Sequence, residues 1–135
     1  MKHITIAIAF LLAGCSTATN PVAPATTPPA APQVSAYNTD TLAVKVSVGT
    51  YVGGYYTPEV EWTFATVSDP NPTTASVLTA GVKYHAYRAL VSGSWSIYYV
   101  SPTPVTIEAG NTYRVTFYGP TSSALNSAST ELNKL

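Results

Sequence analysis

The chain has 135 residues, a formal net charge of zero, 46% hydrophobic residues and only 9% charged residues. This length suits a single small domain. A chain without a basic excess lacks the electrostatic surface that nucleic acids and anionic lipid headgroups require, so we expect no nucleic-acid partner.

The first 20 residues have the layout of a secretory leader, in which Lys2 and His3 precede an apolar run over 4–13 and then small residues. The run is too short to cross a bilayer, because a spanning helix needs about 20 apolar residues. The sequence therefore predicts export rather than a transmembrane anchor.

The leader is expected to span 1–14. Its last three residues and the residue that follows match a known processing signal: Leu12, Ala13, Gly14 and Cys15. They resemble the lipobox of bacterial lipoproteins. The resemblance implies cleavage after Gly14 and acylation of Cys15, where each buried methylene of the acyl chains contributes about 0.8 kcal/mol of membrane binding. Ser16 stands where an aspartate would retain such a protein at the inner membrane, so the implied location is the outer membrane if the host has two membranes. Cys15 is the one cysteine, which leaves no disulfide to form.

Residues 15–36 are expected to form a tether behind the acylated cysteine. Apart from Cys15 they are almost wholly Ala, Thr, Pro, Ser and Val, with five prolines and no charge. Such a composition cannot build a core, and proline favours an extended chain of about 3.1 Å per residue. We expect a spacer between membrane and domain.

The folded domain is expected over 37–119, because its hydrophobic pattern has a period of two. Alternation over 42–48 and again over 60–64 predicts two half-buried strands. Further strands are predicted over 77–79, 82–89, 94–100, 105–108 and 113–118, with turns between them that include 68–72. Seven short strands predict an all-β fold, namely a small antiparallel β-sandwich.

One segment of the predicted sandwich has a more specific pattern, formed by Ile107, Gly110, Tyr113, Val115 and Phe117. It resembles the turn into the tyrosine-corner strand of fibronectin type III and related immunoglobulin-like domains. The resemblance implies that the Tyr113 ring packs inward and that its hydroxyl bonds to the main chain of the corner, with Trp62 in the core between the sheets. No clear strand is predicted after Phe117, where that family has one, so a prealbumin-like sandwich ending here stays open.

The polar tail over 120–135 carries apolar residues at helical spacing: Leu125, Ala128, Leu132 and Leu135. This spacing predicts a short terminal helix that docks on the sandwich, frays or meets a partner.

The residues available for catalysis are few. His85 is the one histidine after the leader, and its place in a predicted strand favours a surface or cross-strand role. Glu59 and Glu61 alternate with apolar residues, as on a solvated strand face. No spacing indicates a metal site, a phosphate loop or a cofactor, and we expect the protein not to be an enzyme.

A tyrosine- and glycine-rich segment over 49–56 is the candidate ligand-binding element, with Tyr51, Tyr55 and Tyr56. Tyrosine offers a large amphipathic area at low entropic cost, and glycine lets the backbone adapt, so the composition suits a recognition loop. The alternative is a hairpin whose tyrosines cover the core.

The expected function is a lipid-anchored envelope protein whose β-sandwich is an interaction or structural module, with an envelope protein or a glycan as partner. A carbohydrate-binding module using the three tyrosines together with Tyr98 is the alternative, and it requires exposed, coplanar rings. A hydrolase that depends on His85 ranks third.

Overall fold

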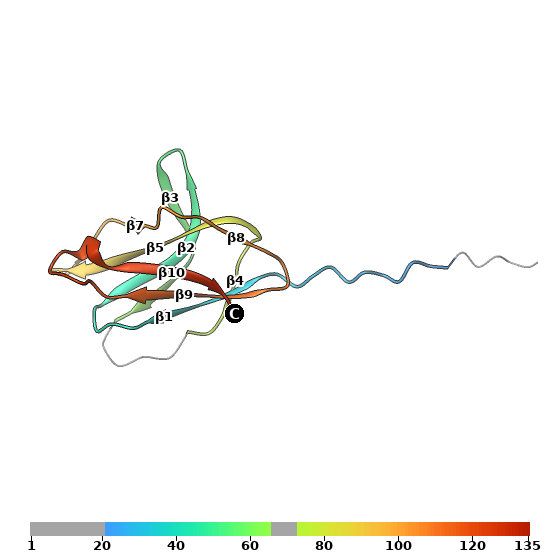
Figure 1. Ribbon diagram of the computed structural model, residues 1–135, viewed down its shortest axis with the longest axis horizontal. Coiled ribbons are helices and arrows are strands. Elements are labelled where there is room, and N and C mark those ends of the chain that lie inside the picture. Colours follow the sequence, from blue (N-terminus) through green and yellow to red (C-terminus); the bar gives the residue numbers. More distant parts are fainter. Residues whose placement is uncertain (1–20, 66–72) are drawn as a thin grey trace, which may run out of the picture.

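The computed structural model describes residues 21–65 and 73–135. The lipobox residues Leu12, Ala13 and Gly14, the acylation site Cys15 and the predicted 68–72 turn lie outside these residues. The described part is an all-β fold whose ten strands form two sheets, with the segment after residue 20 leading away from them (Figure 1).

The smaller sheet has four strands in the order β10-β9-β1-β4. Their bounds are Gln33–Asn38 for β1, Ser76–Val77 for β4, Thr112–Tyr118 for β9 and Ser129–Lys134 for β10. β1 runs parallel to β9, whereas the other pairs are antiparallel. The predicted small antiparallel β-sandwich is confirmed. The pair of β1 and β9 is parallel because the two strands are far apart in the chain and no hairpin constrains their direction.

The larger sheet has the order β3-β2-β5-β6, and β7 and β8 also pair with β5. Its strands are β2 (Val44–Val52), β3 (Tyr55–Phe64), β5 (Gly81–Val91), β6 (Ser94–Trp95), β7 (Tyr99–Val100) and β8 (Val105–Ile107). The single strand predicted over 94–100 is thus two short strands. Each pairs with a different part of β5.

The core is built from the alternating residues of both sheets. Val44, Val46 and Val48 of β2 are fully buried, as are Val115 and Phe117 of β9. Together these apolar side chains form one buried cluster, as the period of two in the sequence predicts. Trp62 is partly buried and packs against the cluster.

The predicted tyrosine corner has the expected geometry. The Tyr113 side chain is 2% exposed, and its hydroxyl accepts the backbone N–H of Glu108 at 3.0 Å. Gly110 between them has a φ of +79°, which a side chain would strain. The corner therefore closes the β8–β9 connection onto the core.

The sandwich begins earlier than the expected boundary at 37. β1 starts at Gln33, and its residues Val34 and Ala36 are fully buried. The tether was predicted to extend to residue 36 because the uncharged composition of the proline-rich segment continues beyond Pro32, the last proline before β1. Residues 21–31 are exposed and have no regular secondary structure.

The tail is a strand rather than the expected terminal helix. A single turn of 3₁₀ helix, η1 (Leu125–Ser127), precedes β10, which pairs antiparallel with β9. The buried positions are Ala128, Thr130 and Leu132, with a period of two. The spacing of the apolar residues alone suggested a helix, but Thr130 is also buried and completes the alternation of a strand with Ala128 and Leu132. The domain thus extends well past 119.

Candidate functional site

The tyrosine- and glycine-rich segment is a β-hairpin rather than an open loop. β2 and β3 pair up to Val52 and Tyr55, and Gly53 and Gly54 form the turn with φ angles of +60° and +85°. A two-residue turn with positive φ at both positions suits glycine. The hairpin projects beyond the rest of the sandwich (Figure 1).

The hairpin projects beyond the sandwich because of how its strands pair. β2 is paired with β5 only from Val44 to Gly49, so the residues beyond Gly49 have only β3 beside them in the sheet. A β-bulge interrupts the β2–β3 register between Val48 and Gly49. A bulge bends and twists a strand, and the absence of a side chain at Gly49 allows the main chain of Thr57 to approach closely.

The three predicted tyrosines do not cover the core. The side chain of Tyr55 is 79% exposed and that of Tyr51 is 44% exposed. Tyr56 is half-buried, and its hydroxyl donates to Ser47 Oγ at 2.9 Å. Burial raises the pKa of Tyr56 far above its ordinary value of 10.0. Tyr56 therefore anchors the base of the hairpin, and Tyr51 and Tyr55 are accessible.

The hairpin forms one wall of a groove of about 580 Å³, which we call the tyrosine groove. Its lining residues come from the hairpin and from the segment around β7: Tyr51, Gly54, Tyr55, Tyr56, Ile97, Tyr98 and Val100. The structure thus brings the three predicted tyrosines together with Tyr98. Ile97 is 78% exposed and was not predicted, because only the fold places it opposite the hairpin.

The rings of the groove do not form one flat surface. The Tyr56 and Tyr98 rings meet edge to face, with centroids 5.0 Å apart and an interplanar angle of 63°. Tyr51 lies 5.6 Å from the Tyr84 ring at an angle of 47°. Both pairs have the tilted geometry that aromatic rings prefer, and neither offers the coplanar platform required by the carbohydrate alternative.

A charged cluster supports Tyr98 from beneath. The Tyr98 hydroxyl donates to Glu61 at 2.6 Å. The same carboxylate accepts from Arg88 at 2.9 Å and lies 3.3 Å from Lys45 Nζ. Burial acts to raise the pKa of Glu61, but the bonds from Tyr98, Arg88 and Lys45 outweigh it and lower that pKa below 4.5. Burial and the Glu61 carboxylate raise the pKa of Tyr98 to about 12.

The cations of this cluster also contact aromatic rings. Arg88 Cζ lies 4.8 Å from the centroid of Tyr98, and Lys45 Nζ lies 5.0 Å from that of Trp95. Both distances suit cation–π attraction. Tyr98 is therefore held at its hydroxyl and over its ring face, which fixes one wall of the tyrosine groove.

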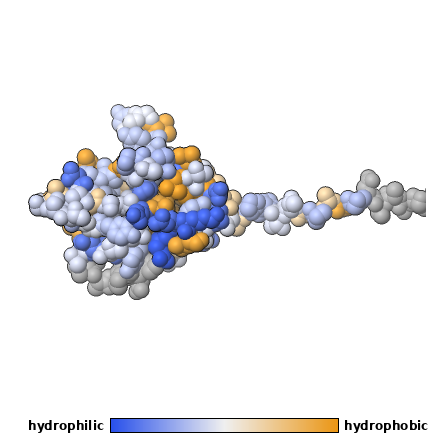
Figure 2. Space-filling view, in the orientation of Figure 1, coloured by the Kyte–Doolittle hydropathy of each residue, from blue (hydrophilic) through white to orange (hydrophobic). Residues whose placement is uncertain are grey.

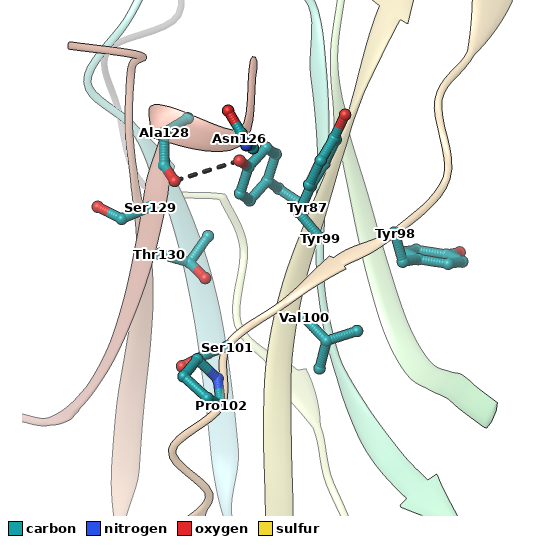
Figure 3. Close-up of a pocket in the computed structure, with 10 residues that line it drawn as sticks. All are labelled: Tyr87, Tyr98, Tyr99, Val100, Ser101, Pro102, Asn126, Ala128, Ser129 and Thr130. Carbon is teal, nitrogen blue, oxygen red and sulfur yellow. Dashed lines mark hydrogen bonds between the residues drawn. The ribbon is translucent and has the colours of Figure 1, made fainter. Parts of the chain in front are cut away.

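A second hollow, about 420 Å³ in volume, lies where β7 of the larger sheet approaches β10 of the smaller one (Figure 3). We call it the seam pocket. It is lined by Tyr87, Tyr98, Tyr99, Val100, Ser101, Pro102, Asn126, Ala128, Ser129 and Thr130. Sequence reasoning missed it, because its walls come from strands that only the tertiary fold brings together.

His85 is buried between the sheets, so the surface alternative of its expected surface or cross-strand role is wrong. Its side chain is 4% exposed, and Nδ1 lies 2.7 Å from Thr130 Oγ1 of β10. It shares the inward face of β5 with Tyr87, which the alternation of the strand dictates. Burial lowers the pKa of His85 below 6.5, although Glu131 acts against this shift.

Glu59 and Glu61 bind different cations and do not act as a pair of free carboxylates. Glu59 accepts from Lys83, a residue that is itself buried, and from Thr79. Glu59 is exposed, as the predicted solvated strand face requires, whereas Glu61 is only partly exposed. Within 21–65 and 73–135 no cluster of three His, Cys, Asp or Glu side chains is arranged to hold a metal ion.

No family model, curated protein or solved structure matches this chain. Among the residues that the structure describes, no helix is both long and apolar enough to cross a membrane.

Proposed function

We propose that the protein is a lipid-anchored envelope lipoprotein whose β-sandwich is a recognition module. The anchor rests on the match of Leu12, Ala13, Gly14 and Cys15 to a lipobox. Residues 21–28 are exposed and the segment extends away from the sandwich in Figure 1, as a tether would, whereas Ala30 already accepts a hydrogen bond from the Gly110 N–H. In a host with two membranes, Ser16 after the acylated cysteine favours the outer membrane.

The observation that carries the recognition role is the tyrosine groove. Its lining is aromatic and aliphatic without a charged residue, and Tyr55 and Ile97 are both more than three-quarters exposed, at 79% and 78%. The centres of protein interfaces are likewise rich in tyrosine and depleted in charge, with polar groups at the rim. Glu61, Lys45 and Arg88 supply such polar groups next to Tyr98.

A protein segment is the partner that this geometry favours. A sugar chain binds best to rings that share one plane, whereas the Tyr56 and Tyr98 rings are tilted by 63°. Tilted rings in a groove that Ile97 and Val100 also line suit side chains that insert among them. In Figure 2 the projecting hairpin is pale to orange, which matches the absence of charged residues over 46–58.

We further propose an immunoglobulin-like arrangement rather than a prealbumin-like one. The Tyr113 hydroxyl accepts the Glu108 N–H as in a tyrosine corner, and β10 supplies the strand after Phe117 that the sequence did not predict. This strand removes the departure on which the prealbumin-like alternative rested.

A role without catalysis is part of the same proposal. His85, the one histidine outside the leader, is 4% exposed and bonded to Thr130, so it has no access to a substrate. Catalysis by a nucleophile that histidine activates requires the histidine to be accessible at the substrate. We therefore propose a binding protein with no cofactor and no nucleic-acid partner.

The anchor is tested by labelling bacteria that make the full chain with a radioactive or clickable fatty acid. The wild-type chain should carry the label and sediment with membranes, and a Cys15→Ser variant should do neither. Retained label in that variant would remove the lipoprotein assignment.

The recognition role is tested by a binding screen of the lipidated protein against envelope proteins and glycans of its host. A Tyr51→Ala/Tyr55→Ala variant should lose a protein partner while keeping its circular dichroism spectrum and Tm. Thr106→Ala, an exposed position on β8, is the matched control. Loss of a glycan instead would support the carbohydrate alternative, and equal binding by all three proteins would exclude the groove.

A further inference from the structure

The seam pocket is a second site, built differently from the tyrosine groove. It opens between the β7 segment and β10 with η1, and in Figure 3 Tyr87 and Tyr99 stand side by side near Asn126. Its volume of about 420 Å³ falls in the range of small-ligand pockets, about 300–1,000 Å³. The pocket is thus large enough for a ring-sized ligand.

The chemistry of its walls selects for neutral polar ligands. No Asp, Glu, Lys or Arg is among the residues that line it. Its polar groups include the hydroxyls of Ser101 and Ser129 and the amide of Asn126, which donate as well as accept hydrogen bonds. A phosphate or carboxylate would find no cation here, and a ligand with many hydroxyl groups would find matching partners.

An aromatic platform stands at one end of the pocket. The Tyr99 ring stacks on Tyr87 with centroids 5.0 Å apart and an interplanar angle of 18°. Tyr87 is held in turn: its hydroxyl lies 2.7 Å from the carbonyl oxygen of Leu125 and 3.1 Å from that of Ala128, and its ring packs against Phe117. A platform fixed this way loses little conformational entropy when a ligand binds.

We propose that the seam pocket binds a neutral sugar unit of a glycan. One face of a sugar ring presents C–H groups, which pack on the electron-rich face of an aromatic ring, and the rim presents hydroxyls. Tyr99 supplies the ring, and Asn126, Ser129 and Ser101 supply the hydrogen bonds. This site differs from the tyrosine groove, whose lining is aromatic and aliphatic and whose rings are tilted.

The test is a titration of the full lipidated chain, in detergent, with the β-1,4-linked trimer of N-acetylglucosamine and with maltotriose. Saturation-transfer NMR reports which sugar protons contact the protein, and calorimetry reports Kd. At least one sugar should bind, and Tyr99→Ala should weaken it about tenfold, as expected for loss of a stacking contact. Tyr55→Ala, in the tyrosine groove, should leave Kd unchanged.

A second variant guards against misfolding of Tyr99→Ala. Asn126 and Ser129 are exposed, so the Asn126→Ala/Ser129→Ala double variant should keep the fold and still weaken sugar binding severalfold. The proposal is overturned if neither sugar binds at millimolar concentration, or if this folded double variant binds as tightly as the wild type. Sugar binding that is lost only in Tyr55→Ala would also overturn it.

Discussion

Two segments of this chain place a tyrosine after a glycine of positive φ, and they use it in opposite ways. At the corner, Gly110 has a φ of +79° and Tyr113 is 2% exposed. At the hairpin, Gly54 has a φ of +85° and Tyr55 is 79% exposed. The residue types are the same, and the difference arises because the side chain of Tyr113 on β9 faces the other sheet whereas the start of β3, with Tyr55, extends past it. The corner tyrosine stabilises the fold, and the hairpin tyrosine is available to a partner.

The largest expected effect comes from the corner. Tyr113→Ala should lower the free energy of unfolding by about 3–5 kcal/mol, because it leaves a cavity in the core and removes the bond to Glu108 N–H. Tyr113→Phe keeps the packing and should cost about 1–3 kcal/mol for the unpaired N–H. Urea denaturation measures both. A loss under about 1 kcal/mol in Tyr113→Ala would contradict the contrast between the two segments.

A smaller loss is expected from the turn of the hairpin. Gly54→Ala forces a side chain into a positive φ and should cost about 1–2 kcal/mol. Thermal unfolding measures it, and Thr57→Ala, an exposed residue of the same hairpin, is the control. If Gly54→Ala had no effect on Tm, the positive φ at this position would be refuted.

Alkaline pH should weaken the fold at the base of the hairpin, where Tyr56 and Tyr98 are partly buried. The pKa of Tyr98 is raised to about 12 and that of Tyr56 is raised as well, mainly by burial. The unfolded chain ionises near pH 10, so stability from these groups is complete below pH 10 and declines as the pH rises above it. Urea midpoints at increasing pH should show a shallower decline in Tyr56→Phe than in the wild type, and an equal decline in both would contradict this expectation.

The smallest expected effect is that of Tyr55→Ala on stability. A side chain with 79% exposure and no hydrogen bond among the described residues should change the free energy of unfolding by less than about 0.5 kcal/mol. Differential scanning calorimetry measures it. A drop comparable with that of Tyr113→Ala would mean that the hairpin tyrosines support the fold after all.

The sequence predicted the parts of the fold that depend on local alternation. The core strands β2, β5 and β9 were predicted because Val44, Val46 and Val115, among others, recur at a period of two. The Tyr113 bond was expected from the resemblance of 107–117 to a tyrosine corner, a motif short enough to be recognised within a few residues of chain.

What the sequence did not predict depends on contacts between distant segments. β1 is stabilised by parallel pairing with β9, and β10 by pairing with the same strand, so their short polar sequences carried little signal of their own. The three hairpin tyrosines were identified from composition, but Ile97 and the seam pocket required the fold. The exposure of His85 was predicted wrongly because the alternation along one strand distinguishes two faces but does not show which of them is buried.

The most direct test of the central claim is photo-crosslinking in the bacterium that makes the protein. A photoreactive phenylalanine is placed at Tyr55, at Ile97 or at the exposed Thr106 in the full chain, and adducts are resolved by mass. A recognition module that uses the tyrosine groove should give one discrete protein adduct at the first two positions and none at Thr106. The same adducts at all three positions, or none at Tyr55 and Ile97, would contradict it.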